Sequence, residues 1–147
     1  MTAVPPQARA DACAAAMWRD DQASQGLGMA IEHIGPGAAC LSMPVLPRML
    51  NGHGTCHGGY IFTLADSAFA FACNTYGMVS VASQCAITFL RPARVGERLV
   101  ATAAERHREG RSGIYDVRVM AGSDVVAEFR GHSRTTGARL LGGGDAQ

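Results

Sequence analysis

Charge is scarce in this sequence, and neither sign of charge dominates. Only 17% of the 147 residues are Asp, Glu, Lys or Arg, the net charge is +1, and 48% of the residues are hydrophobic. A chain without excess positive charge has little with which to neutralise phosphates, which argues against a protein that binds nucleic acid or an anionic membrane. The low charge also suggests that copies of the chain bury apolar surface between them.

Several signals of export, membrane insertion and nucleotide binding are also missing. The first 25 residues have no basic-then-apolar order, and polar residues and glycine interrupt the long apolar stretch 58–90. The five cysteines are widely scattered and form no Cys-x-x-Cys pair, so we expect free thiols. The segment GHGTCHGG (52–59) lacks the lysine of a phosphate-binding P-loop, and no dinucleotide-binding fingerprint follows a strand. We expect a reduced, soluble, cytoplasmic protein.

Hydrophobic periodicity and turn signals predict one domain over residues 1–147. Helical spacing of alanines marks an N-terminal helix, and runs rich in β-branched residues mark strands in the second half. The elements expected, in order, are a flexible arm (about 1–7), a helix (8–25), two strands on either side of Gly35–Gly37, a loop (47–57), a helix (58–75), four strands (79–92, 96–107, 113–120 and 124–135) and a flexible tail (about 137–147).

The helix predicted at 58–75 is apolar on nearly all its sides, which is typical of a buried helix. Six apolar residues occupy one helical face, and further apolar residues lie on another: Ile61, Leu64, Ala65, Ala68, Phe69 and Ala72, then Phe62 and Cys73. A long antiparallel sheet that wraps around this helix would bury it. We therefore predict an α+β fold.

Asp66 is the only charged residue between Arg48 and Arg91. A buried carboxylate is costly unless it has a partner or a function. It could be structural, bonded to local backbone or to the hydroxyls of Thr63 and Ser67. Alternatively it could be catalytic, as a general base on water or as a nucleophile, with a pKa raised by its apolar surroundings.

Two glycines, Gly58 and Gly59, occupy the first turn of the same helix. Backbone N–H groups there have no partner within the helix and suit an anionic oxygen, and glycine lets a ligand approach closely. The alternative is that the pair only makes a tight turn from loop to helix.

The spacing of Gly58 and Asp66 has a consequence for assembly. Eight residues on one helix correspond to about 12 Å along its axis. A donor and a carboxylate that act on one carbonyl must both lie about 3 Å from the reacting group. If both are catalytic, they come from two antiparallel copies of the helix, and the enzyme is at least a dimer.

The loop before the helix offers further candidates. Asn51 could hold a water or a carbonyl, and His57 could orient the carbonyl or the loop, or both could simply make loop hydrogen bonds. Zinc binding by His53, Cys56 and His57 is disfavoured, because the segment is glycine-rich and no further ligand is evident. A Cys56–His57 nucleophilic pair is also disfavoured, since sequence neighbours rarely reach the required geometry.

The blocks NGHGTCHGGYIFTLADSAFAFACN (51–74) and VASQCAITFLRPARVGERLVATA (81–103) resemble the hotdog-fold acyl-CoA thioesterases, and among them the phenylacetic acid degradation (PaaI) thioesterase family. The likeness extends from about residue 10 to about 136. It implies the hotdog fold, an antiparallel sheet around a central helix, and dimers that pair into tetramers with active sites at the dimer interface.

The resemblance also implies roles for particular residues. Asp66 corresponds to the catalytic carboxylate, Gly58 to the amide that polarises the carbonyl, and His57 and Asn51 to the neighbouring loop residues. The expected reaction is hydrolysis of phenylacetyl-CoA or a ring-hydroxylated relative, with coenzyme A as part of the substrate and no other cofactor. Residues expected at the substrate are Gly59, Ser67, Tyr60 and Phe62, with Arg91 and Arg94 at the coenzyme A phosphates.

Other functions remain open on the sequence. A non-catalytic protein that binds acyl-CoA or an aromatic ligand would keep the pocket but would not need a lone carboxylate opposite an anion site. A hotdog dehydratase would need a differently placed acid and histidine. A thioesterase for other short or medium acyl-CoAs would share the mechanism and differ only in its acyl pocket.

Overall fold

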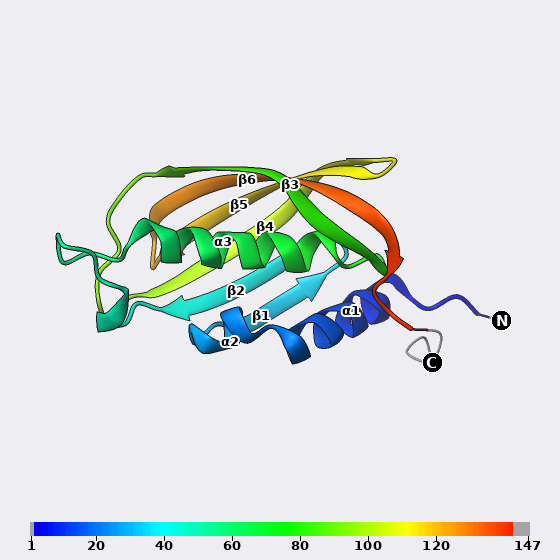
Figure 1. Cartoon of the computed structure of the whole chain (residues 1–147), viewed down its shortest axis with the longest axis horizontal. Coiled ribbons are helices and arrows are strands. Elements are labelled where there is room, and N and C mark those ends of the chain that lie inside the picture. The colour runs from blue at the N-terminus through cyan, green and yellow to red at the C-terminus, as the bar shows by residue number, and fades with distance from the viewer. Residues whose placement is uncertain (1, 143–147) are drawn as a thin grey trace.

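The computed structural model describes residues 2–142. Two helices open the chain, one long helix lies in its middle, and six strands form a single sheet (Figure 1). The elements are α1 (Pro6–Asp20), α2 (Gln22–Gly26), β1 (Ala30–Gly35), β2 (Ala38–Pro44), the 3₁₀ helix η1 (Pro47–Met49), α3 (Gly58–Cys73), β3 (Met78–Phe89), β4 (Arg98–Glu109), β5 (Ser112–Ala121) and β6 (Asp124–Arg139). Within the described residues, no helix is long and apolar enough to cross a membrane.

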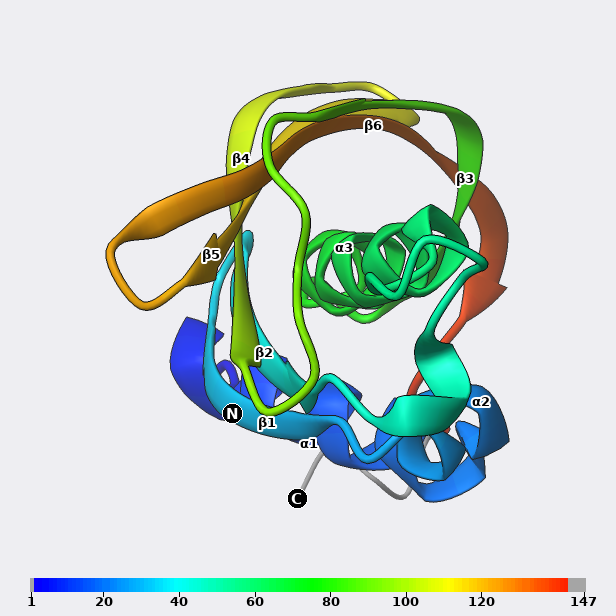
Figure 2. The ribbon, with the colours of Figure 1, turned by 90° about the vertical axis from the view of Figure 1, so that its left-hand side faces the viewer.

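The strands follow the order β1-β2-β4-β5-β6-β3, and every neighbouring pair is antiparallel. The sheet curls around α3, which Figure 2 shows end-on inside it. This confirms the α+β prediction of a sheet wrapped around a central helix. The topology leaves β1 and β3 as the two edge strands, and β3 is the strand that follows α3 along the chain.

The helix α3 packs into the sheet through large aromatic contacts. Phe69 is 1% exposed, and its ring centroid lies 5.7 Å from that of Tyr115 and 5.9 Å from that of Phe129. Gly131 on β6 makes room for this ring, because a Cβ there would lie 2.8 Å from three Phe69 ring atoms. The packing of α3 against β6 therefore depends on a residue without a side chain at position 131.

The N-terminal helix predicted at 8–25 is in fact two helices. It breaks at Asp21, whose carboxylate accepts hydrogen bonds from the Ser24 amide at 2.9 Å and the Ser24 hydroxyl at 2.7 Å. An aspartate that caps a new helix start in this way competes with continuation of the old helix. Alanine periodicity did not reveal this break.

The ends of the regular structure also differ from the prediction. The first helix begins at Pro6, inside the arm expected at about 1–7, and β6 continues to Arg139, inside the tail expected from about 137. Ladder hydrogen bonds to β3 organise this end of β6, with Met78 paired to Arg139. Met1 and residues 143–147, on which the rest of those two predictions falls, lie outside the described residues.

Candidate active site

The loop before α3 is attached to η1 and to the connection between β3 and β4 by backbone hydrogen bonds. The Cys56 N–H donates to the Ala93 carbonyl and the His57 N–H to the Met49 carbonyl, both at 2.8 Å, and Leu50 and Cys56 form an isolated β-bridge. These bonds determine where the helix starts.

Asn51 shapes the tip of that loop. Its side-chain oxygen accepts hydrogen bonds from the backbone N–H groups of His53 at 2.9 Å and Thr55 at 3.2 Å, and its amide donates to the Thr55 hydroxyl at 3.2 Å. The side chain therefore makes the loop hydrogen bonds that were one of its two predicted roles.

His57 caps α3. Its Nδ1 accepts a hydrogen bond from the Gly59 N–H at 2.9 Å, while its carbonyl accepts one from the Tyr60 N–H at 3.0 Å. A ring nitrogen that accepts from an amide carries no proton, so the cap requires the neutral imidazole with its proton on Nε2. That His57 orients the loop or a substrate carbonyl stays a prediction.

These bonds leave one free donor at the start of the helix. The Gly58 N–H donates to no group within residues 2–142. Gly58 also faces a ring that the sequence did not point to, because a Cβ at this position would lie 3.0 Å from Phe89. The Phe89 side chain is 51% exposed, so this amide lies beside an open aromatic surface at the end of β3.

Asp66 lies two turns further along α3 and is half-buried. Burial raises the pKa of its carboxyl group, as the apolar surroundings predicted. A single side chain within residues 2–142 hydrogen-bonds to it, the thiol of Cys85 on β3, with Sγ 3.9 Å from Oδ1. No arginine or histidine forms an ion pair with it there.

The predicted structural partners of Asp66 are used elsewhere. The Thr63 hydroxyl donates to the Gly59 carbonyl at 2.8 Å. The Ser67 hydroxyl lies 2.8 Å from that of Ser24, which in turn donates to Asp21. Ser67 therefore donates its proton towards α2 and has only lone pairs left for a water. The two hydroxyl bonds that the structural interpretation of Asp66 proposed are therefore not formed.

One chain does not bring Gly58 and Asp66 together. They lie eight positions apart on the same continuous helix, which is about 12 Å along the axis. Both candidates are present, but they are too far apart to act on one carbonyl.

The remaining residues predicted to contact the substrate are two aromatic residues, Tyr60 and Phe62, and two arginines, Arg91 and Arg94. Tyr60 is half-buried with its ring 6.3 Å from that of His57, whereas Phe62 packs edge-on against Phe129 at 5.4 Å and contacts the core. Arg91 is engaged by Glu97 at 2.7 Å and Asp124 at 3.4 Å.

Arg94 is exposed, and its guanidinium forms no ion pair within residues 2–142. It follows Ala93, whose carbonyl accepts a hydrogen bond from the Cys56 N–H. Arg94 therefore lies on the connection between β3 and β4, beside the loop that leads into α3. Of the two predicted phosphate ligands, Arg94 is therefore the available cation, and Arg91 supports the turn through Glu97.

Cys56 does not pair with the neighbouring imidazole. Its thiol donates to the His57 carbonyl at 3.7 Å, and burial raises the pKa of that thiol, so no thiolate is favoured. In the described part of the chain, His, Cys, Asp and Glu side chains form no group of three that could hold a metal ion. All five cysteines are free thiols.

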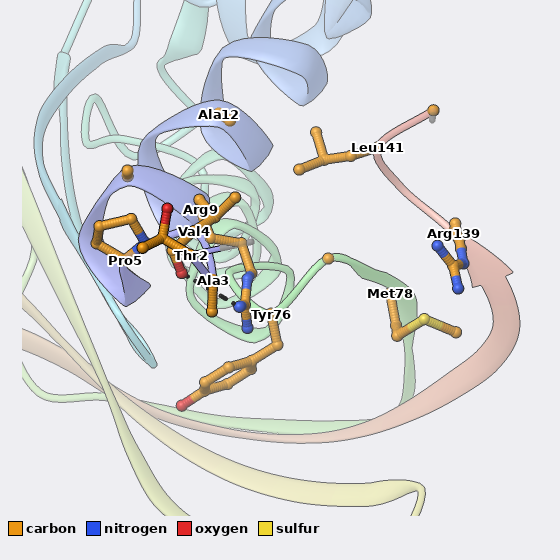
Figure 3. A pocket seen from close by; sticks show the side chains of 13 residues that line it. Thr2, Ala3, Val4, Pro5, Arg9, Ala12, Tyr76, Met78, Arg139 and Leu141 are labelled. Carbon is orange, nitrogen blue, oxygen red and sulfur yellow. Dashed lines mark hydrogen bonds between the residues drawn. The ribbon is translucent and has the colours of Figure 1, made fainter. Parts of the chain in front are cut away.

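A well-defined cavity lies away from these residues, at the other end of α3 (Figure 3). Its volume is about 710 Å³, and its walls come from the N-terminal arm, the start of α1, the turn after α3 and the end of β6. Arg9 and Arg139 approach it from two of these walls. None of the catalytic candidates contacts it, so cavity size does not identify the site in the isolated chain.

Comparison with known proteins points to one family. The model of the thioesterase superfamily matches residues 53–128, which include Gly58, Asp66 and Cys85. The acyl-coenzyme A thioesterase PaaI of Escherichia coli K12 is 45% identical over 128 residues, which cover 86% of this chain and 91% of that protein.

Solved structures agree. The structure of the E. coli PaaI protein from the phenylacetic acid degradation operon aligns with a TM-score of 0.88 and 44% identity, covering 89% of this chain and 96% of that one. A mutant of the phenylacetic acid degradation protein PaaI from Thermus thermophilus aligns with a TM-score of 0.76 and 38% identity, covering 78% and 98%.

Proposed function

The chain belongs to the thioesterase superfamily, and on that basis we propose that it hydrolyses acyl-coenzyme A thioesters, with phenylacetyl-CoA or a ring-hydroxylated derivative as the substrate. The products are coenzyme A and the free acid. The observation that supports this most directly is the Asp66 carboxylate, which is half-buried, has a raised pKa and has no cationic partner among residues 2–142. A carboxylate in such surroundings is a stronger base and nucleophile than an exposed one.

The Gly58 N–H completes the proposed chemistry. As the thioester carbonyl is attacked, negative charge develops on its oxygen, and a free amide at a helix N-terminus stabilises that charge. His57 prepares this donor indirectly, because its cap occupies the neighbouring Gly59 amide and holds the first turn. Asp66 either attacks the carbonyl carbon itself or removes a proton from an attacking water.

Two chains are needed for this site. We place the Gly58 amide of one chain opposite Asp66 of its partner, with the two α3 helices antiparallel. The edge strand β3 supports such a pairing, because its free backbone groups can continue the ladder and its exposed apolar side chains include Val81 at 50% and Phe89 at 51%. The family resemblance extends this to a homotetramer made of two dimers, and we propose that this assembly is cytoplasmic.

Arg94 is the residue we assign to the coenzyme A phosphates. It is exposed, its guanidinium forms no ion pair within 4 Å among residues 2–142, and it lies on the segment bonded to the loop before Gly58. Phe89, whose ring lies beside Gly58, and Tyr60, two residues further along α3, are the aromatic residues that we assign to contact with the acyl group. Phe62 contributes to the core beneath them.

The proposal is tested by the loss of thioester absorbance with a panel of substrates: phenylacetyl-CoA, hydroxyphenylacetyl-CoA, benzoyl-CoA and straight-chain acyl-CoAs. We expect the highest kcat/KM for the phenylacetyl esters and no turnover by Asp66→Asn, with the oligomer intact. Activity on straight chains alone would refute the aromatic substrate and keep the mechanism. Binding without turnover across the panel would instead favour a non-catalytic ligand-binding protein.

Nucleophile and general base are separated by a single turnover in ¹⁸O-labelled water. If Asp66 attacks the carbonyl carbon, the thiolate of coenzyme A leaves and a mixed anhydride forms. Water that attacks the aspartyl carbon of this anhydride leaves its oxygen in the Asp66 carboxylate, so a gain in mass of the peptide that carries Asp66 identifies the nucleophile. If Asp66 activates water, the label appears only in the free acid.

A further inference from the structure

Among residues 2–142, Cys85 is the one residue whose side chain hydrogen-bonds to Asp66. Within residues 2–142 no other group donates a hydrogen bond to that carboxylate, and the Cys85 Sγ lies 3.9 Å from Oδ1. Cys85 is half-buried on β3, while its neighbours Gln84 and Ala86 are exposed. Side chains alternate between the faces of a strand, so the thiol points inwards to α3. The sequence suggested only a small core residue here.

The thiol acts as a donor and does not act as a nucleophile. Burial and the nearby negative charge of Asp66 both raise the pKa of Cys85, so its proton stays on sulfur at neutral pH. A protonated thiol beside a carboxylate can only donate to it, although it does so weakly at this distance. The thiol is therefore always the donor in this contact, and it bonds to one of the two carboxylate oxygens, Oδ1.

Within residues 2–142, no other charged group interacts with the Asp66 carboxylate at this contact. Burial raises the pKa of Asp66, and the thiol hydrogen bond lowers it by favouring the ionised form. Cys73, on the same helix, is the further titratable group that interacts with the pair, and burial raises its pKa to about 12, so it stays neutral. Neither α2, which approaches through Ser24 and Ser67, nor any arginine adds charge at the carboxylate.

We propose that Cys85 is a positioning residue for Asp66, holding Oδ1 so that Oδ2 is presented to the thioester or to the attacking water. This rests on the proposed function of Asp66. Side-chain rotation would otherwise divide the carboxylate among several orientations, because Thr63 and Ser67 are engaged elsewhere. A carboxylate already held in its productive orientation loses less freedom at the transition state.

The test compares three variants at this position by their dependence of kcat on pH with phenylacetyl-CoA. Cys85→Ala and the more bulky Cys85→Val remove the donor, and Cys85→Ser retains one. We expect the two donor-free variants to lose about twofold in kcat, the effect of one weak hydrogen bond of about 0.5 kcal/mol. Their acidic limb should also move to higher pH, because the ionised carboxylate loses its donor. Cys85→Ser should restore the limb.

A matched control is Cys40→Ala, which removes another half-buried thiol, on β2, that bonds to Thr102 and forms no hydrogen bond with Asp66. Its pH profile should coincide with that of the wild type. An unshifted acidic limb in both Cys85→Ala and Cys85→Val would overturn the proposal, whatever their stability, since a purely structural residue changes stability without moving that limb.

A second measurement separates this inference from the proposed function. Proteins labelled with ¹³C at the aspartate carboxyl allow Asp66 to be titrated by NMR without any substrate, with Asp66→Asn used for assignment. The midpoint should be higher in Cys85→Val than in the wild type, and unchanged midpoints would refute the Cys85 contact. An absence of acyl-CoA turnover in the wild type would refute the proposed function, while this titration would still decide the contact.

Discussion

The separation of Gly58 and Asp66 along one helix makes a prediction about mixed oligomers. Asp66→Asn removes the carboxylate with little change in shape. Gly58→Pro removes the amide proton, and the backbone allows it, because the preceding His57 has φ −58° and ψ 133° and proline is favourable at the first helical position. Each variant alone should be inactive or nearly so, with a loss of at least about 100-fold for the missing oxyanion donor.

Mixing the two variants should restore activity. An equal mixture that exchanges subunits freely contains about half mixed dimers, and each mixed dimer has one intact site of two, formed by Gly58 of one chain and Asp66 of the other. The preparation should therefore recover about a quarter of the wild-type kcat at unchanged KM, by the same statistics. The assay is thioester hydrolysis before and after joint unfolding and refolding, with native mass spectrometry to count mixed dimers.

Gly58→Ala is the matched control. It keeps the N–H and adds a Cβ whose three nearest neighbours are atoms of the Phe89 ring, the closest at 3.0 Å, and this ring is half-exposed and can shift. It should retain much more activity than Gly58→Pro and show little gain on mixing. If mixed dimers form and the activity stays at the sum of the two single variants, the two groups do not act across the dimer, and the argument from helix rise is refuted.

Other substitutions test the core, the cap, the charge and the phosphate contact. Gly131→Ala should lower the free energy of unfolding by about 1–3 kcal/mol in denaturant titrations, because its Cβ would overlap the fully buried ring of Phe69. His57→Ala should cost about 1 kcal/mol through loss of the helix cap, and His57→Asn, which can accept the same bond, should recover most of the thermal stability. The folded pKa of Asp66 lies above its ordinary value of 3.8, so the stability from this group is complete below pH 3.8 and is lost as pH rises through the folded value. Asp66→Asn should therefore melt at a higher temperature than the wild type at neutral pH, and the difference should disappear in acid. Arg94→Gln should raise KM for acyl-CoA with kcat and melting temperature unchanged, since the guanidinium has no ion pair to lose within residues 2–142.

Local patterns in the sequence were sufficient for the architecture and for the main catalytic candidates. A helix that is apolar on nearly every side has to be covered, and alternating β-branched runs supply a sheet to cover it. Burying an isolated carboxylate among apolar residues costs free energy, and this cost marked Asp66 as a functional candidate. The helix rise alone also predicted that Gly58 and Asp66 of one chain cannot meet.

Only the tertiary structure decided which neighbours each candidate has. Sequence proximity suggested Thr63 and Ser67 as partners of Asp66, but they bond to the Gly59 carbonyl and to Ser24, while the actual contact comes from Cys85 on a strand 19 residues away. The sequence alone does not distinguish Arg91 from Arg94 as a ligand of the coenzyme A phosphates.

The fold brings Glu97 and Asp124 to the guanidinium of Arg91, which forms ion pairs with both. The guanidinium of Arg94 forms no ion pair within residues 2–142 and is available to a ligand. Helical and strand periodicity is a local property of the chain and is visible in the sequence. The partners of a polar side chain depend on how the sheet curls around the helix, and those are set only when the chain has folded.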